Sequence, residues 1–78
     1  MLEFKMIENT ETTVSYRYYP HRTQDSGLLT VNKKDNSIME QQVANSDEFK
    51  TCFFHLFRKI KDMIKDNDFL NEGIIAWY

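Results

Sequence analysis

Apolar and polar residues alternate along the N-terminal part of the chain with the period of two that is typical of half-buried β-strands. Residues 2–7 follow this pattern, and residues 12–19 are rich in β-branched and aromatic side chains. The polar segment 9–11 lies between them, and Pro20 lacks the N–H that would continue the second ladder. These two segments therefore predict a β-hairpin.

Two shorter apolar segments, 28–31 and 37–39, follow a polar loop over residues 21–26. Between them lie Asp35 and Asn36, which tolerate the left-handed backbone that a tight hairpin needs. A third and a fourth strand are therefore expected.

A helix is predicted over residues 49–64, where apolar side chains recur at the spacing of one helix face. The residues of this stripe are Phe49, Cys52, Phe53, Leu56, Phe57, Ile60, Met63 and Ile64. The preceding segment 45–48 has the pattern of a capping box, in which Asn45 and Glu48 satisfy the first backbone groups of the helix. At the other end, Asn67 is suited to a left-handed C-cap.

Residues 74–78, which follow Gly73, are predicted to form the last strand and are apolar on both faces. A strand of this kind is expected either in the centre of a sheet or with its second face against another chain. The earlier strands differ, because each has one polar face.

These elements predict a single α+β domain over residues 1–78 with the order β-β-β-β-α-β. One helix would pack across one face of a mostly antiparallel sheet, and the last strand would pair with the first. The other sheet face has no predicted cover. It would present Arg17, Tyr19, Leu28 and Thr30, provided that the helix covers Tyr16, Tyr18, Leu29 and Val31. A slip of one residue would reverse this assignment.

Composition places the chain among small folded proteins. It has 78 residues, 41% of them hydrophobic, and a net charge of −2, which argues against disorder and against nucleic-acid binding through bulk positive charge. The single cysteine cannot form an internal disulfide, and charges near the N-terminus argue against a signal peptide or a membrane span. A cytoplasmic location is expected. Because so small a core gives limited stability, self-association or binding to a partner is expected too.

Candidate catalytic chemistry is sparse. Cys52 and His55 are three residues apart on the predicted helix and could form a thiol–imidazole pair, but Cys52 lies in the apolar stripe. Adding His21 gives no spacing typical of a zinc site. Only Gly27 and Gly73 are available for a phosphate-binding or nucleophile turn. The sequence therefore predicts a non-enzymatic protein without a cofactor or metal.

Binding chemistry is richer on the outer face of the predicted helix. Five residues lie within about 80° of one another on the helical wheel. They are Lys50, Phe54, Arg58, Lys61 and Lys65. A basic stripe around an exposed aromatic ring suits nucleic acid or an acidic protein surface, and a solvated helix face is the plain alternative.

A second candidate surface is the stretch 16–22, which is rich in tyrosine and arginine, the residues enriched at interface hot spots. Half of it must face the core by alternation. The predicted binding set is Arg17, Tyr19 and Arg22, joined by Phe54 and by Trp77 and Tyr78 of the last strand.

The segments 47–50, 54–55 and 72–78, together with residues 18–20 and the turn 35–36, resemble a group of short uncharacterised proteins of low-GC Gram-positive bacteria and their phages and mobile elements. The resemblance implies a habitat rather than an activity. Small acidic α+β proteins of such elements are often inhibitors of host defence, such as anti-CRISPR proteins.

The leading functional hypothesis is a binding protein that occupies a surface of a host protein or of its own copy, as in a homodimer. The alternative is a small nucleic-acid-binding regulator that uses the basic helix face. Two further readings stay open: an enzyme that uses Cys52 and His55, and a site for a small ligand between protomers.

Overall fold

The computed structural model describes residues 1–21 and 24–77, which form one helix packed on a five-stranded sheet. The elements are β1 (Leu2–Asn9), β2 (Thr13–Pro20), β3 (Gly27–Asn32), β4 (Ile38–Gln42), α1 (Thr51–Asp66) and β5 (Glu72–Ile75). This is the α+β fold and the β-β-β-β-α-β order that the sequence predicts. The strands extend one to three residues beyond some predicted bounds, and β2 ends on Pro20 rather than before it.

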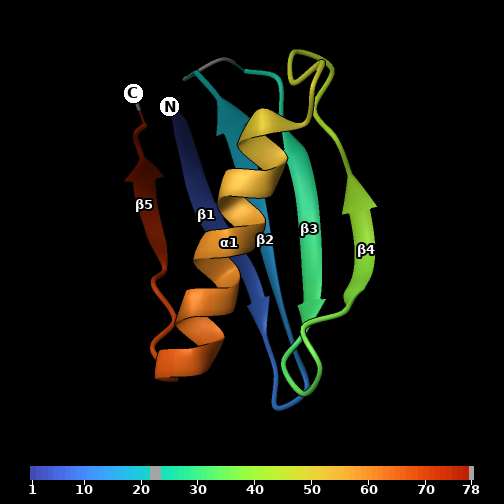
Figure 1. Cartoon of the computed structure of the whole chain (residues 1–78), viewed down its shortest axis with the longest axis vertical. Helices are drawn as coiled ribbons and strands as arrows, with labels where there is room; N and C mark the ends of the chain where they lie inside the picture. Colours follow the sequence, from blue (N-terminus) through green and yellow to red (C-terminus); the bar gives the residue numbers. More distant parts are fainter. Residues whose placement is uncertain (22–23, 78) are drawn as a thin grey trace.

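The sheet has the order β4-β3-β2-β1-β5, and each neighbouring pair is antiparallel. Strands β1 to β4 form a meander, and α1 returns the chain so that β5 pairs with β1 (Figure 1). The predicted pairing of the last strand with the first is therefore confirmed. At the β3–β4 turn, Asn36 has a left-handed φ of 62°, as its side chain permits.

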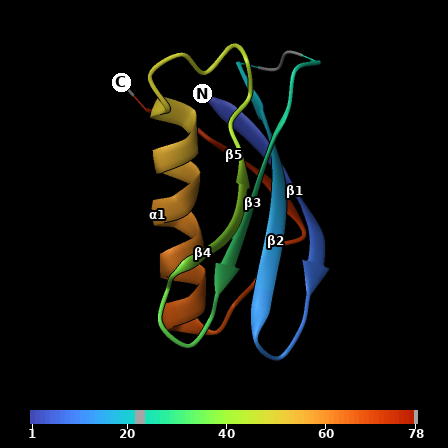
Figure 2. The ribbon, with the colours of Figure 1, turned by 90° about the vertical axis from the view of Figure 1, so that its right-hand side faces the viewer.

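The core lies between α1 and one face of the sheet, and the other face is left without a covering element in the described part of the chain (Figure 2). Tyr16, Tyr18, Leu29 and Val31 are fully buried under the helix. Their neighbours Arg17, Tyr19, Leu28 and Thr30 lie half-buried on the uncovered face, so the predicted register is confirmed. Alternation fixes this result, because one face of each strand packs against the helix.

The start of the helix is a correction to the sequence prediction. The helix begins at Thr51, whereas Asn45 and Glu48 are exposed and belong to turns before it. Asp47 does the capping instead: its Oδ1 accepts the N–H of Cys52 at 3.0 Å, and its Oδ2 accepts the N–H of Phe53 at 2.9 Å. These bonds satisfy donors that have no partner inside the helix.

Asp47 is only 5% exposed because it also joins the helix start to the sheet. The Tyr18 hydroxyl donates to Asp47 Oδ2 at 3.2 Å and accepts the N–H of Ala44 at 3.1 Å. A buried polar group is tolerated when it is hydrogen-bonded in this way. The predicted C-cap is confirmed at the other end, where Asn67 is left-handed with a φ of 51°.

Two predictions about apolar residues are wrong in part. Phe49 was expected in the core stripe, but it precedes the helix and is 85% exposed. Phe57 and Ile64 are half-buried, whereas Cys52, Phe53, Leu56, Ile60 and Met63 are buried. The last strand, predicted over residues 74–78, runs over Glu72–Ile75 instead. It lies at an edge of the sheet, which excludes the central position and leaves the other alternative, a second face against another chain. Gly73 lies inside this strand. The position favours glycine because a Cβ there would be 2.7 Å from the Phe4 ring.

Candidate protein-binding surface

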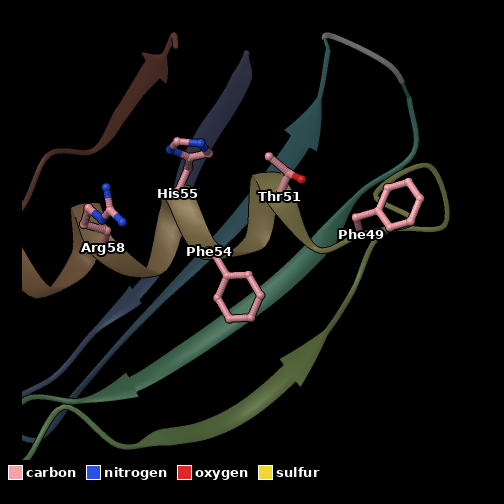
Figure 3. A pocket seen from close by; sticks show the side chains of 5 residues that line it. All are labelled: Phe49, Thr51, Phe54, His55 and Arg58. Atoms are coloured by element: carbon pink, nitrogen blue, oxygen red, sulfur yellow. The ribbon is translucent and has the colours of Figure 1, made fainter. Parts of the chain in front are cut away.

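Two exposed phenylalanine side chains mark the N-terminal end of α1. Phe49 is 85% exposed and Phe54 is 56% exposed. They line a surface hollow of about 250 Å³ together with Thr51, His55 and Arg58 (Figure 3). We call these five residues the aromatic surface. The rings of Phe49 and Phe54 both lie clear of the ribbon, one on the turn before the helix and the other on its outer side.

The turn before the helix sets the position of Phe49. The N–H of Lys50 donates to the Asp47 carbonyl oxygen at 3.0 Å, and the N–H of Phe54 donates to the Lys50 carbonyl oxygen at 2.9 Å. Lys50 itself is left-handed, with a φ of 57°, a conformation that disfavours L-residues by roughly 1–2 kcal/mol. The turn between Asp47 and Thr51 thus leaves the Phe49 ring in solvent rather than in the core.

The five residues of the predicted basic stripe lie along this outer side of the helix start and helix. Lys50, Phe54, Arg58, Lys61 and Lys65 are all exposed. Lys61 Nζ lies 4.7 Å from the centre of the Phe57 ring, which is a cation–π contact within the helix. Neither Lys50 nor Arg58 forms an ion pair with the residues that the structure describes. Both are therefore available to a partner.

His55, at the border of the aromatic surface, stacks on Trp77. The two ring centres are 4.0 Å apart, with 14° between the planes. Trp77 is half-buried and packs against the core, so its ring holds the end of the chain to α1. The sequence placed Trp77 among the binding anchors, and the structure gives it an intramolecular contact beside the aromatic surface.

Arg17 and Tyr19 lie on the sheet face that α1 does not cover, because their neighbours in β2 are buried under the helix. Arg17 Nη1 donates to Ser26 Oγ at 3.1 Å. One acidic and one basic residue accompany them on this face, since Glu3 is opposite Tyr19 and Lys5 is opposite Arg17 in the β1–β2 register. The predicted set is therefore divided between two sides of the molecule. Arg22 and Tyr78, its other members, lie outside the described residues.

Cys52 is poorly placed for nucleophilic chemistry. Its side chain is buried against the sheet, and burial followed by the nearby Asp47 raises the pKa of the thiol. A reactive cysteine needs the opposite shift. His55 is turned toward Trp77 rather than held as a base with a third group. Among the described residues, no group of three His, Cys, Asp or Glu side chains could hold a metal ion.

Phe49 is the candidate binding residue that the sequence pattern missed. Its spacing from Phe53 placed it in the core stripe, and the capping-box pattern started the helix too early. The one local signal in the other direction is Asp47, which competes with Asn45 as a cap.

Comparison with protein-family models, curated proteins and solved structures found no match to this chain. In the described residues, no helix has the length and hydropathy needed to span a membrane. The functional conclusion consequently depends on the surface chemistry alone.

Proposed function

We propose that this chain is a cytoplasmic binding protein that docks an acidic surface of a larger protein through the aromatic surface. The observation that carries the proposal is the exposure of Phe49 beside Phe54 over one hollow. Burying a phenylalanine side chain stabilises by roughly 1.5–3 kcal/mol. Two neighbouring rings left in solvent therefore offer binding free energy that folding does not use.

Charge supports an acidic partner. The chain has a net charge of −2, yet Lys50 and Arg58 flank the exposed rings, and Lys65 extends the basic side of the helix. Arginine beside aromatic residues is the composition found at interface hot spots. A partner with carboxylates around an apolar pocket would complement this arrangement, and the charges would speed its encounter.

The mode of action in this proposal is steric. The docked chain covers the surface of its partner, and the partner loses access to its own ligand or substrate. Inhibition of this kind is what the resemblance to small proteins of phages and mobile elements leads us to expect. It requires affinity and a defined docking geometry rather than catalytic groups.

Single-stranded nucleic acid is the second candidate ligand, because bases stack on exposed aromatic rings and phosphates pair with lysine and arginine. The row of exposed basic residues from Lys50 to Lys65 favours it. Two observations weaken it: Lys61 is engaged with Phe57, and the exposed Asp62 and Asp66 lie among the basic residues. We therefore prefer the protein partner.

Affinity capture followed by titration tests the proposal. The immobilised chain is incubated with a lysate of a low-GC Gram-positive bacterium, and a captured protein is purified and titrated against variants. Phe49→Ala/Phe54→Ala should weaken its binding by about 30-fold or more, the loss of about 2 kcal/mol expected for hot-spot rings. The matched control is Ile7→Ala/Met39→Ala, which truncates side chains that are 50% and 58% exposed elsewhere.

Two results would count against a protein partner. Equal binding by Phe49→Ala/Phe54→Ala and by the control would remove the aromatic surface from the interface. Tight binding of a labelled single-stranded oligonucleotide, with affinity that falls steeply as salt rises, would instead assign this surface to nucleic acid.

A further inference from the structure

The outer edge of β5 carries unpaired backbone groups, and we propose that it pairs with β5 of a second copy of this chain. On one side, β5 is bonded to β1. On its other side, no residue in the described part of the chain pairs with it. The two sheets would join edge to edge about a two-fold axis, on the opposite side of the molecule from β4 (Figure 1). This inference does not depend on the proposed function.

The β1–β5 ladder shows which backbone groups are free. The N–H of Met6 donates to the Asn71 carbonyl oxygen at 2.8 Å, and this pair is next to Lys5 and Glu72 in the register. In an antiparallel ladder, hydrogen-bonded pairs alternate with pairs that are not bonded. Gly73 and Ile75 therefore bond to β1. The N–H and C=O groups of Glu72 and Ile74 point outward, and β5 ends one residue later at Ile75.

The two edges of the sheet differ in how they are protected. At the β4 edge, the pairing with β3 is interrupted between Thr30 and Val31, and the strand carries Glu40 followed by two glutamines. Bulges and charges of this kind prevent edge-to-edge pairing. In β5 the only charged residue is Glu72 at its start and there is no proline, and the register of β5 with β1 is regular. The β5 edge is thus the one open to another strand.

The sequence of this edge is complementary to itself in one antiparallel register. When the two-fold axis passes through Ile74, each Ile74 is opposite Ile74 of the second copy. Glu72 is then opposite Ala76, so the two Glu72 carboxylates are kept apart, which matters because like charges directly opposite destabilise a sheet. This register also uses the outward backbone groups of both Glu72 and Ile74, with Ala76 of the second copy, the residue after its β5, as the partner of Glu72.

Ile74 supplies the apolar contact for this pairing. It is 53% exposed and lines a hollow of about 350 Å³ with Glu3, Glu72 and Gly73. Directly opposite side chains in an antiparallel pair have Cβ atoms roughly 4.5–5.5 Å apart. Ile74 of the second copy would therefore pack on Ile74 and cover the side of this hollow.

Cysteine cross-linking of Ile74→Cys is the sharpest test. Paired residues of this type have Cα atoms about 5.5 Å apart, within the range of roughly 4.4–6.8 Å that a disulfide spans. The matched control is Met39→Cys on the opposite edge, where the native side chain is 58% exposed. Cys52 is buried, and the wild-type chain measures any reaction that it contributes.

Under mild oxidation, Ile74→Cys should form a covalent dimer of twice 9.4 kDa. Its initial rate should be at least about tenfold higher than that of Met39→Cys at equal concentration, because a paired edge raises the effective concentration of the two thiols. Equal rates for the two variants would overturn the proposal.

Sedimentation equilibrium gives an independent readout without a cross-link. The wild-type chain should dimerise, and Ile74→Lys should remain monomeric because it places two positive charges opposite each other on the two-fold axis. Met39→Lys should dimerise like the wild type, and circular dichroism checks that each variant is folded. The pairing is overturned if the wild-type dissociation constant is weaker than about 1 mM, or if Ile74→Lys dimerises as well as the wild type.

Discussion

The inner and outer sides of α1 both carry phenylalanine, but in different surroundings. Phe53 and Phe54 are neighbours in sequence, yet Phe53 is 1% exposed under the helix and Phe54 is 56% exposed on its outer side. The inner side holds the helix to the sheet, whereas nothing in the described fold requires an aromatic residue at position 54. Folding therefore does not account for the aromatic residue on the outer side, and the proposed binding function would use it.

Buried polar side chains also distinguish the inner side of α1 from its outer side. In the described part of the chain, every buried side-chain nitrogen or oxygen has a hydrogen-bond partner. Asp47, Tyr16 and Tyr18 meet these requirements at the inner side of the helix and at its start. The interface between helix and sheet is therefore internally complete, and the outer side is the part of α1 that can change without affecting the fold.

Truncation of Phe53 should destabilise the fold far more than truncation of Phe54. Phe53→Ala should lower the free energy of unfolding by about 3–5 kcal/mol, because it leaves a cavity beneath the helix. Phe54→Ala should lower the free energy of unfolding by about 1 kcal/mol or less. The Phe54 ring is mostly in solvent and makes one edge-on contact with Phe53, with 5.6 Å between the ring centres. Urea unfolding measures both values. Similar losses for the two variants would show that the outer side also stabilises the fold.

Asp47→Ala should have the next largest effect, a loss of about 2–3 kcal/mol, because it leaves two helix N–H groups and the Tyr18 hydroxyl without their acceptor. Asn45→Ala is the matched control, since Asn45 is exposed and should change stability by about 0.5 kcal/mol or less. Thermal and urea unfolding of the pair measure the difference. A larger loss for Asn45→Ala would restore the capping box that the sequence predicts.

The fold was largely predictable because its signals are local. Alternation placed Tyr16 and Arg17 on opposite faces, and Asn36 and Asn67 adopt the left-handed backbone that their side chains favour. Short hairpin connections then constrained the order of β1 to β4. These features depend on residues close together in sequence, so a single chain contains enough information to predict them.

The helix start and the last strand depend on contacts that are distant in sequence. Asp47 rather than Asn45 caps the helix because Tyr18, 29 residues earlier, supplies a buried partner for it. Apolar residues on both faces suggested either a central strand or one whose second face meets another chain, and β5 lies at the edge with Ile74 exposed. Sequence periodicity reports which residues are apolar, but it does not report which of them the sheet order leaves uncovered.

The candidate site was predictable in part for the same reason. Phe54 and Arg58 follow from the helical wheel, so the sequence placed them on the outer face. The exposure of Phe49 does not follow from the helical wheel, because it depends on the hydrogen bonds of Asp47 to the helix start and on the left-handed backbone of Lys50. Arg17 and Tyr19 were grouped with Phe54 by composition, and composition does not show that the sheet lies between them.

A smaller loss than that of Phe53→Ala or Asp47→Ala is expected at neutral pH from Tyr16, whose hydroxyl donates to the Leu70 carbonyl oxygen at 2.7 Å and lies 3.2 Å from Met63 Sδ. Tyr16→Phe should lower the free energy of unfolding by about 1 kcal/mol, the value of one such hydrogen bond. Phe54→Tyr is a matched control that changes a ring hydroxyl on the outer side, and it should leave stability unchanged. A larger change from Phe54→Tyr would contradict the distinction between the two sides of α1.

Alkaline pH should lower the free energy of unfolding, because it ionises the same Tyr16 hydroxyl under the helix. Burial, followed by the nearby Asp68, raises the pKa of Tyr16 from 10.0 to about 12, and burial raises the pKa of Tyr18 in the same direction. The folded state therefore favours the neutral phenols. Their contribution is complete below the pKa of about 10 that tyrosine has in an unfolded chain, and it is lost as pH rises from there through the folded-state pKa. The stability difference between wild type and Tyr16→Phe should thus shrink above about pH 10. Urea unfolding at a series of pH values measures it, and a difference that stays constant to about pH 12 would show that the Tyr16 hydroxyl is not held neutral by the fold.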